Sequence, residues 1–179
     1  FLGSFDYRKG CLDLVNIFVQ IKRAVPDCAF TLIGVKGTFQ TEKAILNFFP
    51  EYLRPDIKVL LSFNSNDLPI FLKNVKVSVF PSYFEGFPFS VIECISAGIP
   101  VCAYDAPGAS SMLPDSLLDK TGNWQGLANK AISLLTNQEY YLEISNQVML
   151  QSKPYNWEDI AINTLKIYEI AWLKKTSKI

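Results

Sequence analysis

The chain has 179 residues, of which 49% are hydrophobic, with 17 basic side chains, 17 acidic side chains and no histidine. A chain of this length and hydrophobicity can bury the core of one folded domain, which excludes intrinsic disorder. The balanced charge argues against a nucleic-acid-binding surface. Without histidine, the chain itself cannot supply a Ser-His-Asp triad, a Cys-His pair, a histidine metal site or a histidine general base.

The cysteines, Cys11, Cys28, Cys94 and Cys102, are scattered along the chain and form no Cys-x-x-Cys pair. Zinc sites and redox pairs need close spacing, so we expect reduced, buried thiols in a cytoplasmic protein that binds no metal. No apolar run reaches the roughly 18 residues of a membrane helix. Because Phe1 stands inside a strand-like run, we expect the sequence to be a fragment of a larger protein.

Short β-branched or aromatic runs alternate with segments of helical period. Expected strands span residues 1–5, 29–33, 57–63, 75–80 and 100–104, with a short sixth at 117–118. Expected helices span residues 11–24, 41–49, 67–72, 88–98, 124–135, 139–151 and 157–175. Strands alternating with helices predict a single Rossmann-like α/β domain over residues 1–179, with a parallel sheet covered by helices on both faces.

In open α/β sheets, ligands bind at the carboxyl ends of the strands, beside helix N-termini. The strand-to-helix turns at that edge span residues 4–10, 34–39, 63–67, 81–90 and 105–112. The turn at 81–90 is the most informative, because Gly86 permits close approach of a ligand and Pro88 suits the first position of a helix. The N–H groups near Phe87, Phe89 and Ser90 would then be free to bind a phosphate or a sugar hydroxyl.

Two carboxylates in this region each allow two interpretations. Glu93 lies on an otherwise apolar helix, where it occupies either a solvated stripe with Ser90 and Ser96 or a cleft in which it accepts hydrogen bonds from a ligand. Glu85, in the turn, is either a solvated loop carboxylate or a member of the same site. The pattern alone leaves both alternatives open.

This region resembles the signature of the family 4 nucleotide-sugar glycosyltransferases, which have the GT-B fold. In that signature Pro-Ser precedes Glu-Gly-Phe, a second Glu follows eight positions after the first, and small residues lead to Gly-x-Pro-Val. The matching residues are Pro81-Ser82, Glu85-Gly86-Phe87, Glu93 and 96–101. Weaker resemblance at residues 1–10, 30–34 and 156–168 extends the similarity to nearly the whole chain, which looks like the C-terminal half of such an enzyme.

The resemblance implies roles for the two carboxylates. Glu93 would bind the ribose hydroxyls of the nucleotide, and Glu85 would act as the catalytic residue beside the donor sugar. The remaining residues of the turn and the helix start would line the pocket for the sugar and the diphosphate: Gly86, Phe87, Pro88, Phe89 and Ser90.

The first loop would hold the donor diphosphate. Lys9, taken by itself a solvated loop lysine, would neutralise the diphosphate and help the nucleotide to leave. Ser4 stands where many relatives have an arginine that grips the diphosphate, and Arg8 is near enough to contribute without necessarily replacing it. Ser62 and the pair Ser110-Ser111 also depart from the family pattern, which leaves the base and the sugar undetermined.

The implied function is donor binding within a glycosyltransferase that retains anomeric configuration and needs no metal or cofactor. The donor would be a UDP-sugar rather than a GDP-sugar, and the acceptor a polysaccharide or lipid-linked glycan precursor, as in lipopolysaccharide, capsule or exopolysaccharide synthesis. A separate N-terminal acceptor-binding domain would supply the catalytic histidine. The closing helix, about 156–175, would cross back to that domain or pack on its own, and we expect the enzyme in the cytoplasm or at the inner face of the membrane.

Two other classes of protein stay open at this point. A nucleotide-sugar epimerase uses the same scaffold, although the Glu-Gly-Phe match argues against it. A non-catalytic α/β binding module, such as a flavodoxin-like receiver, would want an acidic cluster after the first strand, where Asp6 stands alone beside Arg8 and Lys9.

Overall fold

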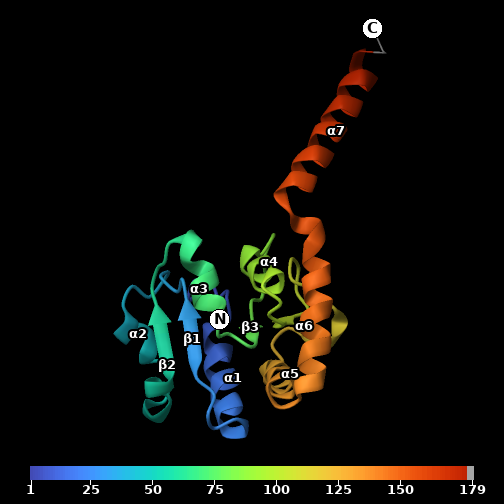
Figure 1. Cartoon of the computed structure of the whole chain (residues 1–179). Helices are drawn as coiled ribbons and strands as arrows, with labels where there is room; N and C mark the ends of the chain where they lie inside the picture. Colours follow the sequence, from blue (N-terminus) through green and yellow to red (C-terminus); the bar gives the residue numbers. More distant parts are fainter. Residues whose placement is uncertain (177–179) are drawn as a thin grey trace.

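A computed structural model describes residues 1–176 as an α/β domain in which strands alternate with helices (Figure 1). The strands are β1 (Phe30–Ile33), β2 (Ile57–Leu60), β3 (Ser78–Phe80), β4 (Val101–Tyr104) and β5 (Leu118–Asp119). The α-helices are α1 (Cys11–Ala24), α2 (Glu42–Leu46), α3 (Leu68–Leu72), α4 (Phe89–Ser96), α5 (Trp124–Thr136), α6 (Gln138–Ser152) and α7 (Trp157–Thr176). Short 3₁₀ helices lie at Glu51–Asp56, Ser65–Asp67, Asp115–Leu117 and Lys153–Tyr155. The expected α/β fold class is confirmed.

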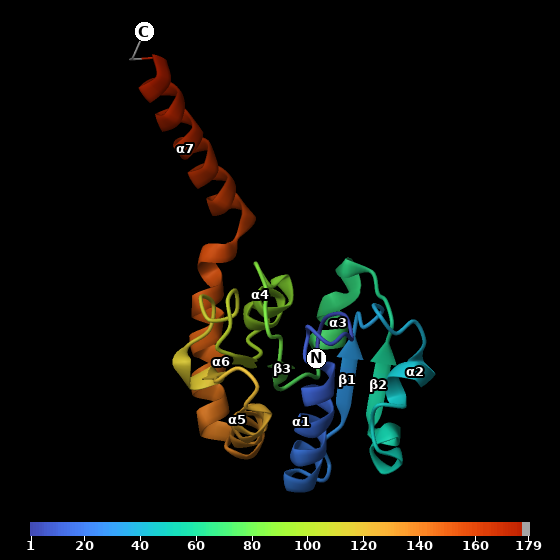
Figure 2. The same cartoon turned by 180° about the vertical axis from the view of Figure 1, so that it is seen from behind.

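The strands form two parallel sheets. β1 pairs with β2, and β3, β4 and β5 pair in that order. The N-terminal segment lies between β1 and β3 in both views, but it contributes only one isolated bridge, from Leu2 to Ile33 (Figures 1 and 2). The prediction of a full strand over residues 1–5 is therefore wrong: this segment bonds to the edge of β1, and no regular ladder joins it to β3 within residues 1–176.

The core is formed by the apolar faces of the helices and by the buried strands. In α1, Leu14, Ile17, Phe18 and Ile21 recur at helical spacing and all are buried. This face of α1 packs against α5, and α4 packs against α6. Every residue of β3 and β4 is buried, which is the pattern expected of parallel strands covered on both faces.

Four elements are at least three residues shorter than predicted. The helix expected at 41–49 ends at Leu46, and the strand expected at 57–63 ends at Leu60. The strand expected at 75–80 begins at Ser78, and the helix expected at 88–98 spans Phe89–Ser96. Phe48 and Phe49 lie beyond the end of α2 and pack edge-on or tilted against the buried ring of Phe5. This tertiary contact outweighs the helical preference of the segment.

The cysteines are free thiols, as expected. Burial raises the pKa of Cys11 and Cys94 to about 11 and that of Cys102 to about 12, so these thiols stay protonated at neutral pH. The expectation of burial is wrong only for Cys28, which is half-buried where the chain enters β1.

Helix α7 extends away from the rest of the domain (Figures 1 and 2). Its apolar side chains Trp157, Ile162, Leu165, Ile167 and Tyr168 are between 50% and 72% exposed. The alternative in which this helix packs on its own domain is therefore wrong, and the crossing to a second domain stays a prediction. Among residues 1–176, no helix is both long enough and apolar enough to cross a bilayer.

Candidate functional site

The strand-to-helix turns meet at the carboxyl edge of the sheets, as the sequence predicted. The turn after β1 touches the first loop, because a Cβ added to Gly37 would lie 3.0 Å from the Cβ of Ser4. The same turn touches the turn after β2, where a Cβ on Gly34 would lie 2.8 Å from the ring of Phe63. These contacts bring residues from distant parts of the chain to one edge.

Glu85 lies at the centre of a charged cluster on this edge. Its Oε1 atom accepts hydrogen bonds from Lys9 Nζ at 2.6 Å, Arg8 Nη1 at 2.7 Å and Ser82 Oγ at 2.7 Å. Arg8 also donates to the backbone carbonyl of Phe84 at 2.7 Å. The first loop and the turn after β3, distant in sequence, are thus joined through one carboxylate.

The electrostatics keep Glu85 ionised. Burial by itself raises its pKa, but hydrogen bonds from Lys9 and Ser82 and the charges of Lys9 and Arg8 outweigh burial, so the pKa lies below its ordinary value of 4.5. The side chain is only 12% exposed, which excludes a freely solvated loop carboxylate. The Glu85 carboxylate is therefore already paired with Lys9 and Arg8, the two cations that a diphosphate would attract.

The loop that carries Lys9 is held by its own backbone. The Lys9 N–H donates to Asp6 Oδ1 at 2.9 Å, and the ammonium lies 5.1 Å from the centroid of the Phe80 ring. Gly10 is the N-cap residue of α1 and has φ of 73°, and a Cβ there would lie 2.0 Å from the carbonyl oxygen of Pro81. This close approach fixes the loop against the end of β3, and Lys9, with a side chain 12% exposed, is not a solvated loop lysine.

Ser4 supports the same loop. Its hydroxyl donates to Asp6 Oδ2 at 2.5 Å, so Ser4 orients the carboxylate that binds the Lys9 backbone. A direct contact between Ser4 and a donor stays a prediction.

Helix α4 points its N-terminus at this edge. The helix begins at Phe89, so Pro88 is the N-cap residue and not the first helical residue, and no side chain caps the helix. The N–H groups of the first turn of a helix have no partner within the helix, which fits the prediction for Phe89 and Ser90. The rings of Phe87 and Phe89 are exposed and meet edge to face, with centroids 5.5 Å apart.

Glu93 and Gly86 border open space. Glu93 is exposed on α4, and desolvation raises its pKa. None of the ion pairs formed by residues 1–176 includes Glu93. A Cβ on Gly86 would meet no atom within 4 Å. This exposure suits either interpretation of Glu93, and ribose binding stays a prediction.

A cluster of one carboxylate and two tyrosines lies beside the site and was not predicted from the sequence. Asp13 Oδ2, in the first turn of α1, accepts hydrogen bonds from the hydroxyls of Tyr83 at 2.6 Å and Tyr104 at 2.7 Å. The hydrogen bond to Asp13, together with burial, raises the pKa of Tyr83 to about 12, and burial followed by the same acceptor raises that of Tyr104 further. No local signal in the sequence indicated this cluster, because an acidic residue in the first turn of an amphipathic helix such as α1 is common.

Within residues 1–176 there is no group of three or more cysteine, aspartate or glutamate side chains that could hold a metal ion. The expectation that the reaction needs no metal or cofactor is not tested by this finding and stays a prediction.

Comparison with known proteins identifies the class. The sequence model of the family described as "Glycosyl transferases group 1" matches residues 1–149, so the chain belongs to this family. An uncharacterized glycosyltransferase of Methanocaldococcus jannaschii is 27% identical over 172 residues, covering 94% of this chain and 47% of the relative. The N,N'-diacetylbacillosaminyl-diphospho-undecaprenol alpha-1,3-N-acetylgalactosaminyltransferase of Campylobacter jejuni is 33% identical over 107 residues, covering 58% of this chain and 28% of the relative. The chain thus spans less than half the length of these curated relatives.

Solved structures show the same fold. Sucrose-phosphate synthase from Thermosynechococcus elongatus superposes with a TM-score of 0.81 at 22% identity, covering 97% of this chain and 45% of that chain. The Anabaena protein HepE, solved in complex with UDP, has a TM-score of 0.73 at 18% identity, covering 95% of this chain and 48% of that chain. The expected GT-B glycosyltransferase fold is confirmed.

Proposed function

We propose that this chain is the donor-binding domain of a retaining glycosyltransferase that moves a sugar from a nucleotide diphosphate sugar to a polysaccharide or lipid-linked glycan precursor. The observation that carries the proposal is the cluster of Lys9, Arg8 and Glu85. The lysine and the glutamate that the family motif assigns to the diphosphate and to the donor sugar meet at 2.6 Å.

The cluster offers a physical route to donor binding. A diphosphate at this edge competes with Glu85 for Lys9 and Arg8, since both are anions seeking the same donors. Once the diphosphate binds Lys9 and Arg8, the Glu85 carboxylate would be free to accept hydrogen bonds from the hydroxyls of the sugar. Lys9 and the first-turn N–H groups of α4 would then stabilise the charge that develops on the leaving diphosphate.

The names of relatives and structural neighbours support a choice of donor and acceptor. UDP in the HepE complex favours a UDP-sugar over a GDP-sugar. The name of the Campylobacter relative describes an undecaprenol-linked substrate, which supports an acceptor of that class and a role in surface glycan synthesis such as lipopolysaccharide. We place the enzyme in the cytoplasm, with peripheral contact to the membrane.

The proposal includes an N-terminal acceptor-binding domain. The exposed apolar residues of α7, among them Ile162, Leu165 and Ile167, suit a helix covered by a second domain. With catalysis in the cleft between two domains, this chain by itself would bind the donor weakly and transfer almost no sugar.

The test is an NMR titration of the ¹⁵N-labelled chain with UDP and with GDP up to millimolar concentration. We expect amide shifts at Lys9 and across residues 85–93, at lower concentrations for UDP. No shift there with either nucleotide would overturn the proposal.

Variants connect these shifts to single side chains. Lys9→Gln and Glu93→Ala should each weaken UDP binding at least about fivefold, equivalent to about 1 kcal/mol, without unfolding the domain. The matched control is Lys73→Gln at the C-cap of α3, where the lysine is exposed and lies outside the turns of the candidate site. If Glu93→Ala melts the domain and leaves binding unchanged, Glu93 is a structural residue.

A further inference from the structure

The turn that carries Glu85 is fastened to α1 by a residue that the family motif does not specify. Tyr83 follows Ser82 in this turn, and its backbone N–H donates to the Arg8 carbonyl at 3.0 Å. Its hydroxyl donates to Oδ2 of Asp13, in the first turn of α1, at 2.6 Å. The main chain and the side chain of Tyr83 therefore bind two points of the segment that runs from the first loop into α1.

Asp13 is itself held by a buried strand. The Tyr104 hydroxyl donates to the same Oδ2 atom at 2.7 Å, and Tyr104, the last residue of β4, is 0% exposed. The rings of Tyr83 and Tyr104 meet edge to face, with centroids 5.5 Å apart. Asp13 thus offers Tyr83 an acceptor that the sheet holds in place, and a hydrogen bond to a carboxylate is stronger than one between neutral groups.

The bonds of Tyr83 bear on the charged cluster of the candidate site. Glu85 stands two residues after Tyr83, and its Oε1 atom binds Lys9 and Arg8 at 2.6 and 2.7 Å. A turn that moved relative to α1 would lengthen both ion pairs, because Glu85 belongs to the turn and its two cations belong to the loop that leads into α1.

The Tyr83 hydroxyl lies at the surface, not in the core. Tyr83 is 43% exposed, so its ring adds less to core packing than the buried ring of Tyr104 does. Its pKa of about 12 keeps the hydroxyl protonated and able to donate at neutral pH. Loss of this hydroxyl should therefore disturb the turn more than the core.

We propose that Tyr83 is a positioning residue, which fixes the turn after β3 against α1 through Asp13 and so sets the place of Glu85 relative to its two cations. The role rests on the proposed function, because the donor would use these same three charged side chains. Tyr83 acts through Asp13 and Glu85 and not by contact with the donor.

The first measurement needs no nucleotide. Tyr83→Phe keeps the ring and removes only the hydroxyl. The pKa of Glu85, followed by ¹³C NMR of its carboxyl group, should then rise toward its ordinary value of 4.5, because the two cations are held less firmly beside it. Asp13→Ala removes the acceptor of the same hydrogen bond and should raise the Glu85 pKa in the same way.

The second measurement is UDP affinity by NMR titration. Tyr83→Phe and Asp13→Ala should each weaken binding at least about threefold, and the double variant should bind about as well as the weaker single variant, because both changes remove one shared hydrogen bond. Asp13→Asn keeps an acceptor oxygen, so it should bind UDP more tightly than Asp13→Ala.

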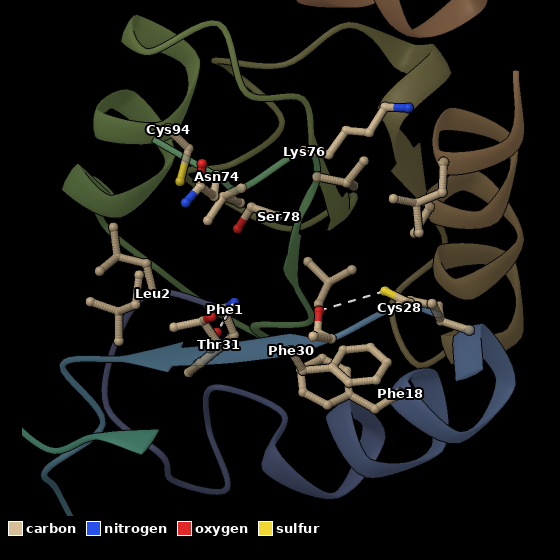
Figure 3. Close-up of a pocket in the computed structure, with 18 of the residues that line it drawn as sticks. Phe1, Leu2, Phe18, Cys28, Phe30, Thr31, Asn74, Lys76, Ser78 and Cys94 are labelled. Atoms are coloured by element: carbon tan, nitrogen blue, oxygen red, sulfur yellow. Dashed lines mark hydrogen bonds between the residues drawn. The ribbon is translucent and has the colours of Figure 1, made fainter. Parts of the chain in front are cut away.

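Phe30→Leu is the control for a general loss of stability. Phe30 begins β1, stacks on Phe18 with centroids 4.1 Å apart, and lines a groove of about 230 Å³ between β1 and β3 (Figure 3). It therefore lies at the amino end of its strand, away from the turns of the candidate site. The variant should lower Tm and leave the Glu85 pKa and UDP affinity unchanged.

Three results would overturn the proposal. An unchanged Glu85 pKa or an unchanged UDP affinity in Tyr83→Phe would show that the hydroxyl contributes to stability alone. Weaker binding in Tyr83→Phe but not in Asp13→Ala would show that the hydroxyl contacts the donor directly. Equal effects in Phe30→Leu would show that any destabilisation gives the same outcome. If the unaltered chain binds neither UDP nor GDP, the proposed function fails, and the Glu85 pKa alone decides whether Tyr83 positions the turn.

Discussion

Replacing Glu85 by Gln asks whether charge, rather than shape, holds the first loop to the turn after β3. Gln has nearly the same shape, but Lys9 and Arg8 lose their ionic partner. The two contributions differ in shielding: the Lys9 and Glu85 side chains are each 12% exposed, whereas Arg8 is 51% exposed. Most of the effect should therefore come from the Lys9 pair.

The expected magnitude follows from these exposures. A hydrogen bond to a charged group contributes about 1.5–3 kcal/mol where it is shielded, and an exposed ion pair contributes about 0–1 kcal/mol. We expect Glu85→Gln to lower the free energy of unfolding by about 2 kcal/mol at pH 7. The folded pKa of Glu85 lies below 4.5, so this stabilisation is present above about pH 4.5 and is lost as the pH falls through the folded pKa.

Urea denaturation of both proteins at a series of pH values between 7 and 3 measures this difference. The two unfolding free energies should converge at the acid end, since a protonated Glu85 resembles Gln. Glu143→Gln, at an exposed position of α6, is the matched control and should change stability by less than about 0.5 kcal/mol. A difference that stays constant from pH 7 to pH 3 would refute the electrostatic reasoning.

Two further substitutions, the second with a matched control, test the packing beneath the site. Tyr104→Phe removes the 2.7 Å hydrogen bond to Asp13 and should cost about 1–2 kcal/mol in urea denaturation, and an unchanged midpoint would show that the bond contributes nothing. Gly10→Ala combines φ of 73° with a Cβ 2.0 Å from a carbonyl oxygen, so we expect a loss above about 3 kcal/mol or no folded protein by circular dichroism. Gly122→Ala has φ of 85° but open space around it, and should cost only about 1 kcal/mol. Equal losses at the two glycines would contradict the clash.

The helices show where local pattern suffices. Helix α1 begins at Cys11 and ends at Ala24, as predicted, because its apolar spacing and the following Pro26 are both local signals. Helix α2 is shorter than predicted because Phe48 and Phe49 pack on Phe5, a contact that local spacing does not reveal.

The candidate site shows the same division. The resemblance to the family motif predicted Glu85 and Glu93 as site residues, and the resemblance of the first loop predicted Lys9. The contact between Lys9 and Glu85 depends on how two loops fold onto each other, and no spacing rule predicts it. The hydrogen bonds from Tyr83 and Tyr104 to Asp13 are even harder to predict from the sequence, because the three residues come from three different elements.

The sequence by itself determined the class of protein: strands alternating with helices define the fold, and Glu85-Gly86-Phe87 with Glu93 defines the family. These features are local, since periodicity and motif spacing depend on neighbouring residues. Only the tertiary structure decided that Lys9 and Arg8 both bind Glu85, that α7 leaves the domain, and that the neutral chain concentrates two cations around one carboxylate. Such pairings depend on the distance between elements in space, which composition and charge do not contain.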